Sequence, residues 1–287
     1  MQQMISKAKI VFGIGDALNA RSFLVEYCKQ KQLPRNHISI YTEKYAWMFE
    51  NMGFNMAKFP KEFKDLTPFN NFGFYDIPKT FETDKCDLCI AKNAGIEYSF
   101  DVRTPLPDYG ELDLKLPKTY VTLNTGYGDF SGNANDPESV CTKSWPIYYW
   151  ERLVELLDVP VVQIGAGKSC EPVKNVAENL VNKTTIKQTA QVLRGALFHI
   201  DMEGGLSILN QHTGGKSVVL FGPTAIQNQG RSFNLNLSAN TCEPCYEWGS
   251  HKYKLCVKKK DLLCKAHCML DLKPEFVAEQ IYKKGWL

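Results

Sequence analysis

The sequence predicts an α/β protein with parallel sheets, divided between two domains. Three observations indicate this: a length of 287 residues, short apolar segments that alternate with helical ones, and prolines clustered near the middle of the chain. The hydrophobic fraction of 44% and the balance of 34 basic against 31 acidic residues are typical of a folded globular protein. A net charge of +3 does not point to a nucleic-acid partner.

Seven apolar segments are expected to be strands, because they lack the polar alternation of a sheet with one solvated face. They span residues 9 to 15, 37 to 42, 87 to 91, 120 to 124, 159 to 165, 196 to 201 and 216 to 222.

Helical spacing of apolar residues predicts the intervening helices. The first crossover helix is expected over 17 to 31 and the last helix over 274 to 284. Another helix should follow Trp145, with Pro146 in its first turn and Ser144 as its cap.

The boundary between the domains is expected around residues 105 to 118, where three prolines lie, which gives domains of residues 1–115 and 116–287. No apolar run reaches the roughly 20 residues of a membrane span. The N-terminal residues lack the features of a secretory signal, so we expect a cytoplasmic protein. Contact with a membrane surface and the oligomeric state stay open.

A Gly13-Ile14-Gly15-Asp16 segment lies where the first strand should turn into the first helix. Glycines allow a tight turn there, at the sheet edge where open α/β folds bind ligands. The Asp16 carboxylate is a candidate acceptor for the proton of an attacking hydroxyl. The alternative is that Asp16 caps the helix, where the helix N-terminus would make it a weaker base.

Lys143 precedes a predicted helix start, and an ammonium beside free backbone N–H groups is suited to a diphosphate. The alternative is a solvated lysine near a core tryptophan, Trp150. Further along, Glu203, Gly204 and Gly205 close a strand and open a helix, and paired glycines let a phosphate approach backbone amides.

Glu171 follows the turn Gly165-Ala166-Gly167. Its carboxylate is a candidate acceptor of hydrogen bonds from ribose hydroxyls, although a surface glutamate needs no such role.

In their order along the chain, these motifs resemble those of glycosyltransferase family 9, the lipopolysaccharide heptosyltransferases and their relatives. The resemblance is clearest in KSWPIYYWERLVELL, VVQIGAG, DMEGGLSIL and VVLFGPT, between residues 143 and 224. In the N-terminal half it rests on GIGDAL, which is similar to the family's GD-[AV]-L segment.

The resemblance implies a GT-B fold, in which two Rossmann-like domains face each other across a cleft. It implies an inverting transfer of a sugar such as heptose from a nucleotide-sugar donor, often ADP-heptose, to a glycan or protein acceptor. The donor would be bound by the C-terminal domain and the acceptor by the N-terminal one. Asp16 matches the family's proposed base, Lys143 its phosphate-binding lysine and Glu171 its ribose contact, and Glu203 to Gly205 match its phosphate-proximal turn.

Two departures from the family pattern concern the identity of the sugar and the nucleotide. Ile208 stands where the family commonly has histidine, and Glu203 where many members have aspartate. The N-terminal half is also short for the family.

A cysteine cluster near the C-terminus has the spacing of a metal site: Cys242, Cys245, Cys256 and Cys268, with Cys264 as an alternative to Cys256 and His267 nearby. Two thiolates of a CxxC pair turn onto one ion, and two more complete a tetrahedral site for zinc or iron. Some relatives are similar in carrying a C-terminal cysteine knot with iron. Four protein ligands leave no open position, so we expect a structural metal.

Three other functions stay open. A related GT-B activity would transfer another sugar or epimerise a sugar phosphate, whereas a non-catalytic protein of this fold would bind nucleotide sugars as a scaffold. The lysines beside the cysteines could indicate a redox or nucleic-acid role, but a solvated lysine run is the commoner case.

Overall fold

The computed structural model describes residues 5–10, 13–42, 44–58, 94–127, 142–242, 244 and 266–287. The chain divides into two compact units, Met1–Leu106 and Pro107–Leu287. The strand expected at 87 to 91 lies outside the described residues. Among those that are described, no helix is both long and apolar enough to cross a membrane.

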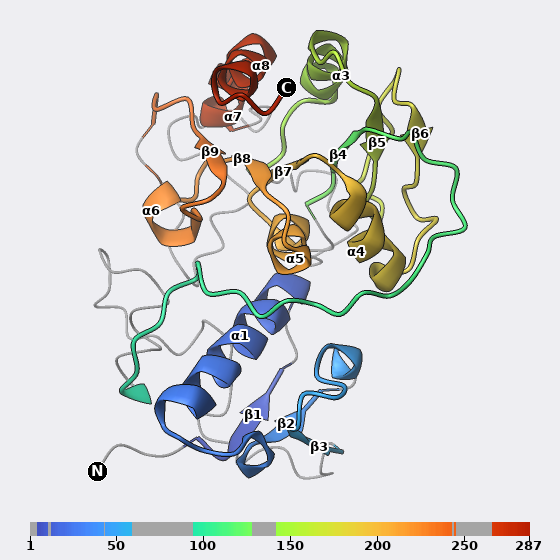
Figure 1. Ribbon diagram of the computed structural model, residues 1–287. Helices are drawn as coiled ribbons and strands as arrows, with labels where there is room; N and C mark the ends of the chain where they lie inside the picture. Colours follow the sequence, from blue (N-terminus) through green and yellow to red (C-terminus); the bar gives the residue numbers. More distant parts are fainter. Residues whose placement is uncertain are drawn as a thin grey trace. The chain divides into compact units, whose positions relative to one another are not determined.

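The first unit contains a parallel sheet of three strands in the order β1-β2-β3. These strands are Lys7–Lys9, Ser39–Tyr41 and Asn55–Ala57. The long helix α1 (Ile14–Gln30) follows β1, and two short 3-10 helices, Arg35–His37 and Ala46–Met48, flank β2 (Figure 1).

The strand expected over 9 to 15 is wrong in extent, because β1 ends at Lys9 and α1 already begins at Ile14. Gly13 is extended, with φ −67° and ψ 167°, and its carbonyl accepts the N–H of Ala17 at 3.1 Å. Asp16 therefore lies in the first helical turn, three residues after the cap.

Arg21 ties α1 to distant parts of the first unit. Its guanidinium is buried and donates to the carbonyls of Met48 at 2.7 Å and Pro105 at 3.0 Å. A buried arginine held by carbonyls needs several acceptors to offset its lost hydration, and these contacts supply them.

The second unit contains a six-stranded sheet in which every strand pair is parallel. The strands are β4 (Val121–Leu123), β5 (Val161–Gln163), β6 (Glu178–Asn179), β7 (His199–Met202), β8 (Ser217–Leu220) and β9 (Leu235–Leu237). Their spatial order is β6-β5-β4-β7-β8-β9, which in chain order reads 3-2-1-4-5-6, the order of the doubly wound nucleotide-binding folds. The order reverses between β4 and β7, and this is where such folds bind ligands.

The strands expected at 120 to 124, 159 to 165, 196 to 201 and 216 to 222 are all present in this sheet. β6 and β9 were not expected, since β6 has two polar residues and β9 has a polar residue, Asn236, between two leucines. Both lie at the sheet edges, where less apolar surface is buried.

The helices of the second unit are α3 (Ile147–Leu156), α4 (Ile186–Gly195), α5 (Gly205–Thr213), α6 (Ile226–Gln229), α7 (His267–Asp271) and α8 (Pro274–Lys283). The expectation that Ser144 caps α3 is wrong. Pro146 is the N-cap, no side chain caps the helix, and the Pro146 carbonyl accepts the N–H groups of Tyr149 and Trp150.

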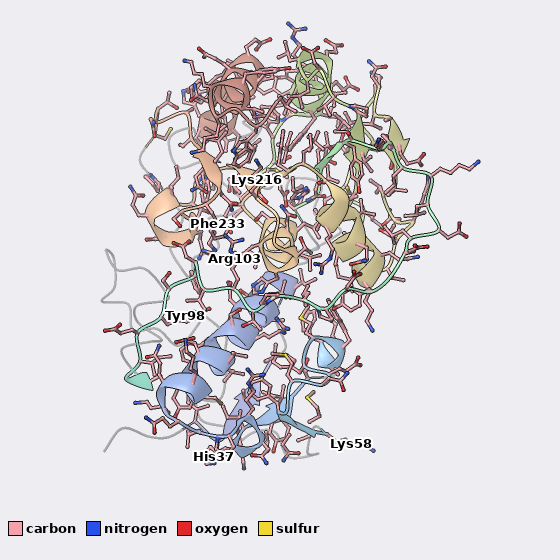
Figure 2. The ribbon with its side chains drawn as sticks, viewed as in Figure 1. His37, Lys58, Tyr98, Arg103, Lys216 and Phe233 are labelled. Atoms are coloured by element: carbon pink, nitrogen blue, oxygen red, sulfur yellow. The ribbon has the colours of Figure 1, made fainter. Side chains whose placement is uncertain are left out.

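Two tryptophans hold α3 and the C-terminal helices in one core. Trp150 is fully buried and meets Trp145 edge-on, with ring centroids 4.8 Å apart. The Trp145 indole N–H donates to the carbonyl of Leu272 at 2.8 Å, just before α8. The ammonium of Lys216, a residue labelled in Figure 2, lies 4.3 Å from the ring centroid of Trp286.

Candidate functional site

Lys143 and Glu203 form an ion pair at the carboxyl edge of the second unit's sheet. Their side chains are 11% and 15% exposed, so the interpretation of Lys143 as a solvated lysine does not hold. The Thr224 hydroxyl donates to the same Glu203 carboxylate oxygen at 3.1 Å. Lys143 lies in the segment before α3, Glu203 directly follows β7, and Thr224 lies between β8 and α6. The parallel strands bring the last two to one edge.

The segment that carries Lys143 is held against β7. Trp145, two residues further on, is 2% exposed, and its backbone N–H points at the Met202 sulfur at 3.3 Å. The lysine is thus positioned by core packing next to the strand that ends in Glu203.

Helix α5 begins at the same place, with Gly204 as its N-cap. The first turn of a helix leaves its N–H groups without intrahelical partners and gives its N-terminus a partial positive charge. The Ser207 hydroxyl donates to the Gly204 carbonyl at 2.7 Å, and the N-cap glycine has no side chain that could accept a first-turn N–H. The arrangement, with an ammonium beside it, is suited to an anionic group.

Gly204 is not required by the backbone. Its φ of −177° is extended, and a Cβ there would meet only the Met202 carbonyl at 3.6 Å and Asp201 Oδ2 at 4.0 Å. Neither the backbone conformation nor crowding requires glycine at this position. The effect of having no side chain here is therefore to leave open space above the turn.

A buried polar network joins β4 to β7 at the reversal of strand order. The Asn124 side-chain amide donates to Asp201 Oδ1 at 2.9 Å and to the Gly126 carbonyl at 2.8 Å, and its oxygen accepts the Gly126 N–H at 3.0 Å. His199 Nε2 lies 3.4 Å from Asp201 Oδ2, and His199 Nδ1 lies 2.9 Å from the Thr122 hydroxyl.

Asp201 is 1% exposed. Burial raises the pKa of its carboxyl, and the neighbouring His199 ring and the hydrogen bond from the Asn124 amide only partly oppose this. Burial likewise raises the pKa of the Cys170 thiol, which lies against Asn124 and Thr125. The strand pattern offered a signal for this network, since His199 and Asp201 are two polar residues on one face of an otherwise apolar segment.

Glu171 is exposed, and its backbone is fixed from two sides. The Thr125 hydroxyl and the Gln163 amide donate to its carbonyl at 2.8 and 2.7 Å. Thr125 follows strand β4 and Gln163 is the last residue of β5, so Glu171 also lies at the carboxyl edge of this sheet. Its carboxylate is available for a ribose, and that role stays a prediction.

A small polar hollow opens beside the start of α5. It is lined by Glu203, Gly204, Ser207, Gln211, Gln229 and Arg231, among others. Arg231 is 3% exposed and is oriented by Gln211 Oε1 at 3.1 Å and the Gln229 carbonyl at 3.0 Å. Sequence reasoning did not select Arg231, because nothing in its local pattern distinguishes it from a surface arginine.

Asp16 belongs to the first unit, where it is the third residue of α1 and its side chain reaches back to the N-cap residue. Its Oδ2 accepts the N–H of Gly13 at 3.2 Å. This contact is compatible with a role as base, since each carboxylate oxygen has two lone pairs.

Only two of the proposed metal ligands lie in the described residues. Cys268 is 7% exposed within the core of the second unit, and Cys242 is partly buried against the same cluster. Cys245 and Cys256, like Cys264, lie outside the described residues. In the described part of the chain no three His, Cys, Asp or Glu side chains form a metal-binding group.

The sequence matches no family model and no curated protein. The fold, in contrast, matches solved structures over almost the whole chain. One is the dodecameric iron-containing heptosyltransferase TibC of enterotoxigenic E. coli in complex with ADP-D-beta-D-heptose, with a TM-score of 0.70, 15% identity, and coverage of 99% of this chain and 78% of TibC.

Two further matches cover both partners almost completely. The glycosyl transferase family 9 protein of Veillonella parvula has a TM-score of 0.66 at 13% identity, covering 99% of this chain and 98% of its own. E. coli heptosyltransferase WaaC with ADP-2-deoxy-2-fluoro heptose has a TM-score of 0.54 at 14% identity, covering 98% and 100%. The chain therefore has the α/β fold with parallel sheets of the GT-B heptosyltransferases.

Proposed function

We propose that this chain is an inverting glycosyltransferase that moves a sugar from a nucleotide-sugar donor to a saccharide or protein hydroxyl. The observation that carries the proposal is the Lys143–Glu203 pair at the N-terminus of α5, on the ligand-binding edge of a doubly wound sheet. Heptose is the proposed sugar and ADP-heptose the donor, because TibC and WaaC have this fold and were solved with ADP-heptose or its fluoro analogue.

The proposed reaction assigns roles to Asp16, Lys143, Glu171 and the turn at Gly204. The acceptor oxygen attacks the anomeric carbon, its proton passes to the Asp16 carboxylate, and the bond to the diphosphate breaks. Lys143 and the amides at Gly204 and Gly205 stabilise the charge on the departing nucleoside diphosphate. Glu171 accepts hydrogen bonds from the ribose hydroxyls.

Calorimetric titration of the full chain with ADP-heptose and ADP-glucose tests the proposal. We expect saturable binding, and slow release of ADP when donor and water alone are present. Binding with no turnover, even with candidate acceptors, would favour the scaffold interpretation. Conversion of the donor into an epimer would favour the alternative GT-B activity.

Substitution of Gly204 by alanine is expected to weaken ADP-sugar binding by about tenfold, ~1.4 kcal/mol, with little change in melting temperature. The added methyl group has room within the fold, with its closest contact at 3.6 Å, but it occupies the space through which a phosphate reaches the amides. Calorimetry and thermal unfolding measure the two effects.

Gly214→Ala is the matched control, at the other end of the same helix. Gly214 has φ +92° and terminates α5, so alanine there should cost about 1 kcal/mol of stability and leave donor affinity unchanged. The proposal for the turn at Gly204 fails if both variants lose affinity in proportion to stability.

We also propose a structural zinc or iron ion held by Cys242, Cys245, Cys268 and either Cys256 or Cys264. Its support is that Cys242 and Cys268, at the two ends of the cysteine-rich segment, pack against one hydrophobic cluster. TibC, which has this fold, is iron-containing.

Elemental analysis of the purified protein should find about one equivalent of metal per chain. Cys242→Ser should lose it and lower the melting temperature, whereas Cys28→Ser, which changes a buried thiol of the first unit, should keep it. Full metal content in Cys242→Ser would remove this cysteine from the ligand set.

A further inference from the structure

His199 and Asp201 are a buried titratable pair next to the turn that begins α5. They are 0% and 1% exposed and project from the same face of β7, with His199 Nε2 3.4 Å from Asp201 Oδ2. That carboxylate oxygen lies 4.0 Å from the position of a Cβ on Gly204. A buried acid thus adjoins the place where the proposed function puts a diphosphate.

The surroundings of the pair suit two protonation states without rearrangement. Asp201 Oδ1 is fixed by the Asn124 amide at 2.9 Å, whatever the charge of the carboxyl. The Thr122 hydroxyl, 2.9 Å from His199 Nδ1, can either donate or accept, so it serves the neutral imidazole and the imidazolium alike.

The other titratable groups near the pair are few in the described structure. The segment after β5 contributes Cys170, and Glu203, which is paired with Lys143, directly follows β7. On the elements packed against β7, strands β4 and β8 carry no titratable side chain within their bounds, and α5 carries only His212 in its last turn.

We propose that the His199–Asp201 pair takes up one proton from solvent when a diphosphate binds at the start of α5, and releases it when the nucleoside diphosphate leaves. This inference rests on the proposed function. A second negative charge beside a buried carboxylate favours the protonated pair, because both charges lie in a medium that screens them weakly. The proton belongs to the pair as a unit, with no assignment to either residue.

The consequence is a donor affinity that depends on pH. The bound state holds one more proton than the free state between the pH at which the free pair loses its proton and the higher pH at which the donor-bound pair loses it. In that range Kd should rise with pH, by at most tenfold per pH unit. His199 and Asp201 are then positioning residues. Their shared proton sets how donor affinity at the turn depends on pH, and in the proposed reaction neither residue touches the sugar or the acceptor.

Calorimetry with ADP-glucose in buffers of different ionisation enthalpy tests the proposal. Its diphosphate is esterified at both ends and exchanges no proton near neutral pH, so a dependence of the observed enthalpy on the buffer reports protons gained by the protein. With the titration repeated across pH, we expect the wild type to show an uptake that rises toward one proton per donor within that range, and Asp201→Asn and His199→Gln to lose most of it.

Cys170→Ser is the matched control, because it changes the other titratable group near Asp201 and should keep the wild-type uptake. Binding with no buffer dependence, or with the same uptake in Asp201→Asn, overturns the inference and leaves the proposed function intact. Absence of any ADP-sugar binding by the folded wild type overturns the proposed function itself. Asp201→Asn is nearly isosteric, and His199→Gln provides a second test of the pair if that variant does not fold.

Discussion

Asp16→Asn is expected to lower turnover by about 100-fold to 10,000-fold, the usual contribution of a positioned general base. An amide cannot accept the proton of the attacking hydroxyl, so the loss should fall on kcat. The Kd for ADP-sugar should stay unchanged, because the proposed donor site belongs to the second unit. Stopped assays with an authentic donor and acceptor, together with calorimetry, measure the two quantities.

Asparagine separates the role of base from that of helix cap. Asp16 Oδ2 accepts the Gly13 N–H at 3.2 Å, and the carbonyl oxygen of asparagine can make the same hydrogen bond. Asp16→Ala loses it and should cost about 1 kcal/mol in stability. If Asp16→Asn retains wild-type turnover, Asp16 is a cap alone and the base lies elsewhere.

Sequence reasoning predicted the second unit's sheet well because its strands are buried on both faces. Segments such as 196 to 201 and 216 to 222 are the short apolar runs that are typical of a covered parallel strand. The same reasoning extended the first strand too far, to residue 15. Gly13 and Gly15 are compatible with a strand end or a helix start, and only the tertiary structure selected the helix.

The motifs of the candidate site were predicted one by one from the sequence. The contacts between these motifs could not be predicted. Lys143 and Glu203 are 60 residues apart in the chain, and no local pattern shows that their side chains meet. In the sequence nothing distinguishes Thr224 and Asn124 from other polar residues. In the structure the strand order places them beside Glu203 and Asp201. Long-range pairing of this kind depends on topology, which the pattern of single segments does not contain.

The two residues of the Lys143–Glu203 pair are expected to affect donor binding in opposite directions. Lys143→Ala removes an ammonium from the proposed diphosphate site and should weaken ADP-sugar binding by about 10-fold to 100-fold, the equivalent of one charged hydrogen bond. It also leaves the Glu203 carboxylate, 15% exposed, without its cation, so the melting temperature should fall.

Glu203→Gln should instead tighten ADP-sugar binding by about threefold to tenfold. In the free protein the Glu203 carboxylate is paired with the Lys143 ammonium, so a diphosphate must compete with that carboxylate for the same ammonium. Glutamine removes that competing charge. Its side-chain oxygen can still accept the hydrogen bond that the Thr224 hydroxyl donates to the Glu203 carboxylate at 3.1 Å in the wild type. Calorimetry at low and high salt measures both variants, and the difference between them should shrink as salt screens the charges. Equal weakening by both substitutions would mean that the ion pair only fixes the segment before α3, and that the diphosphate does not meet Lys143.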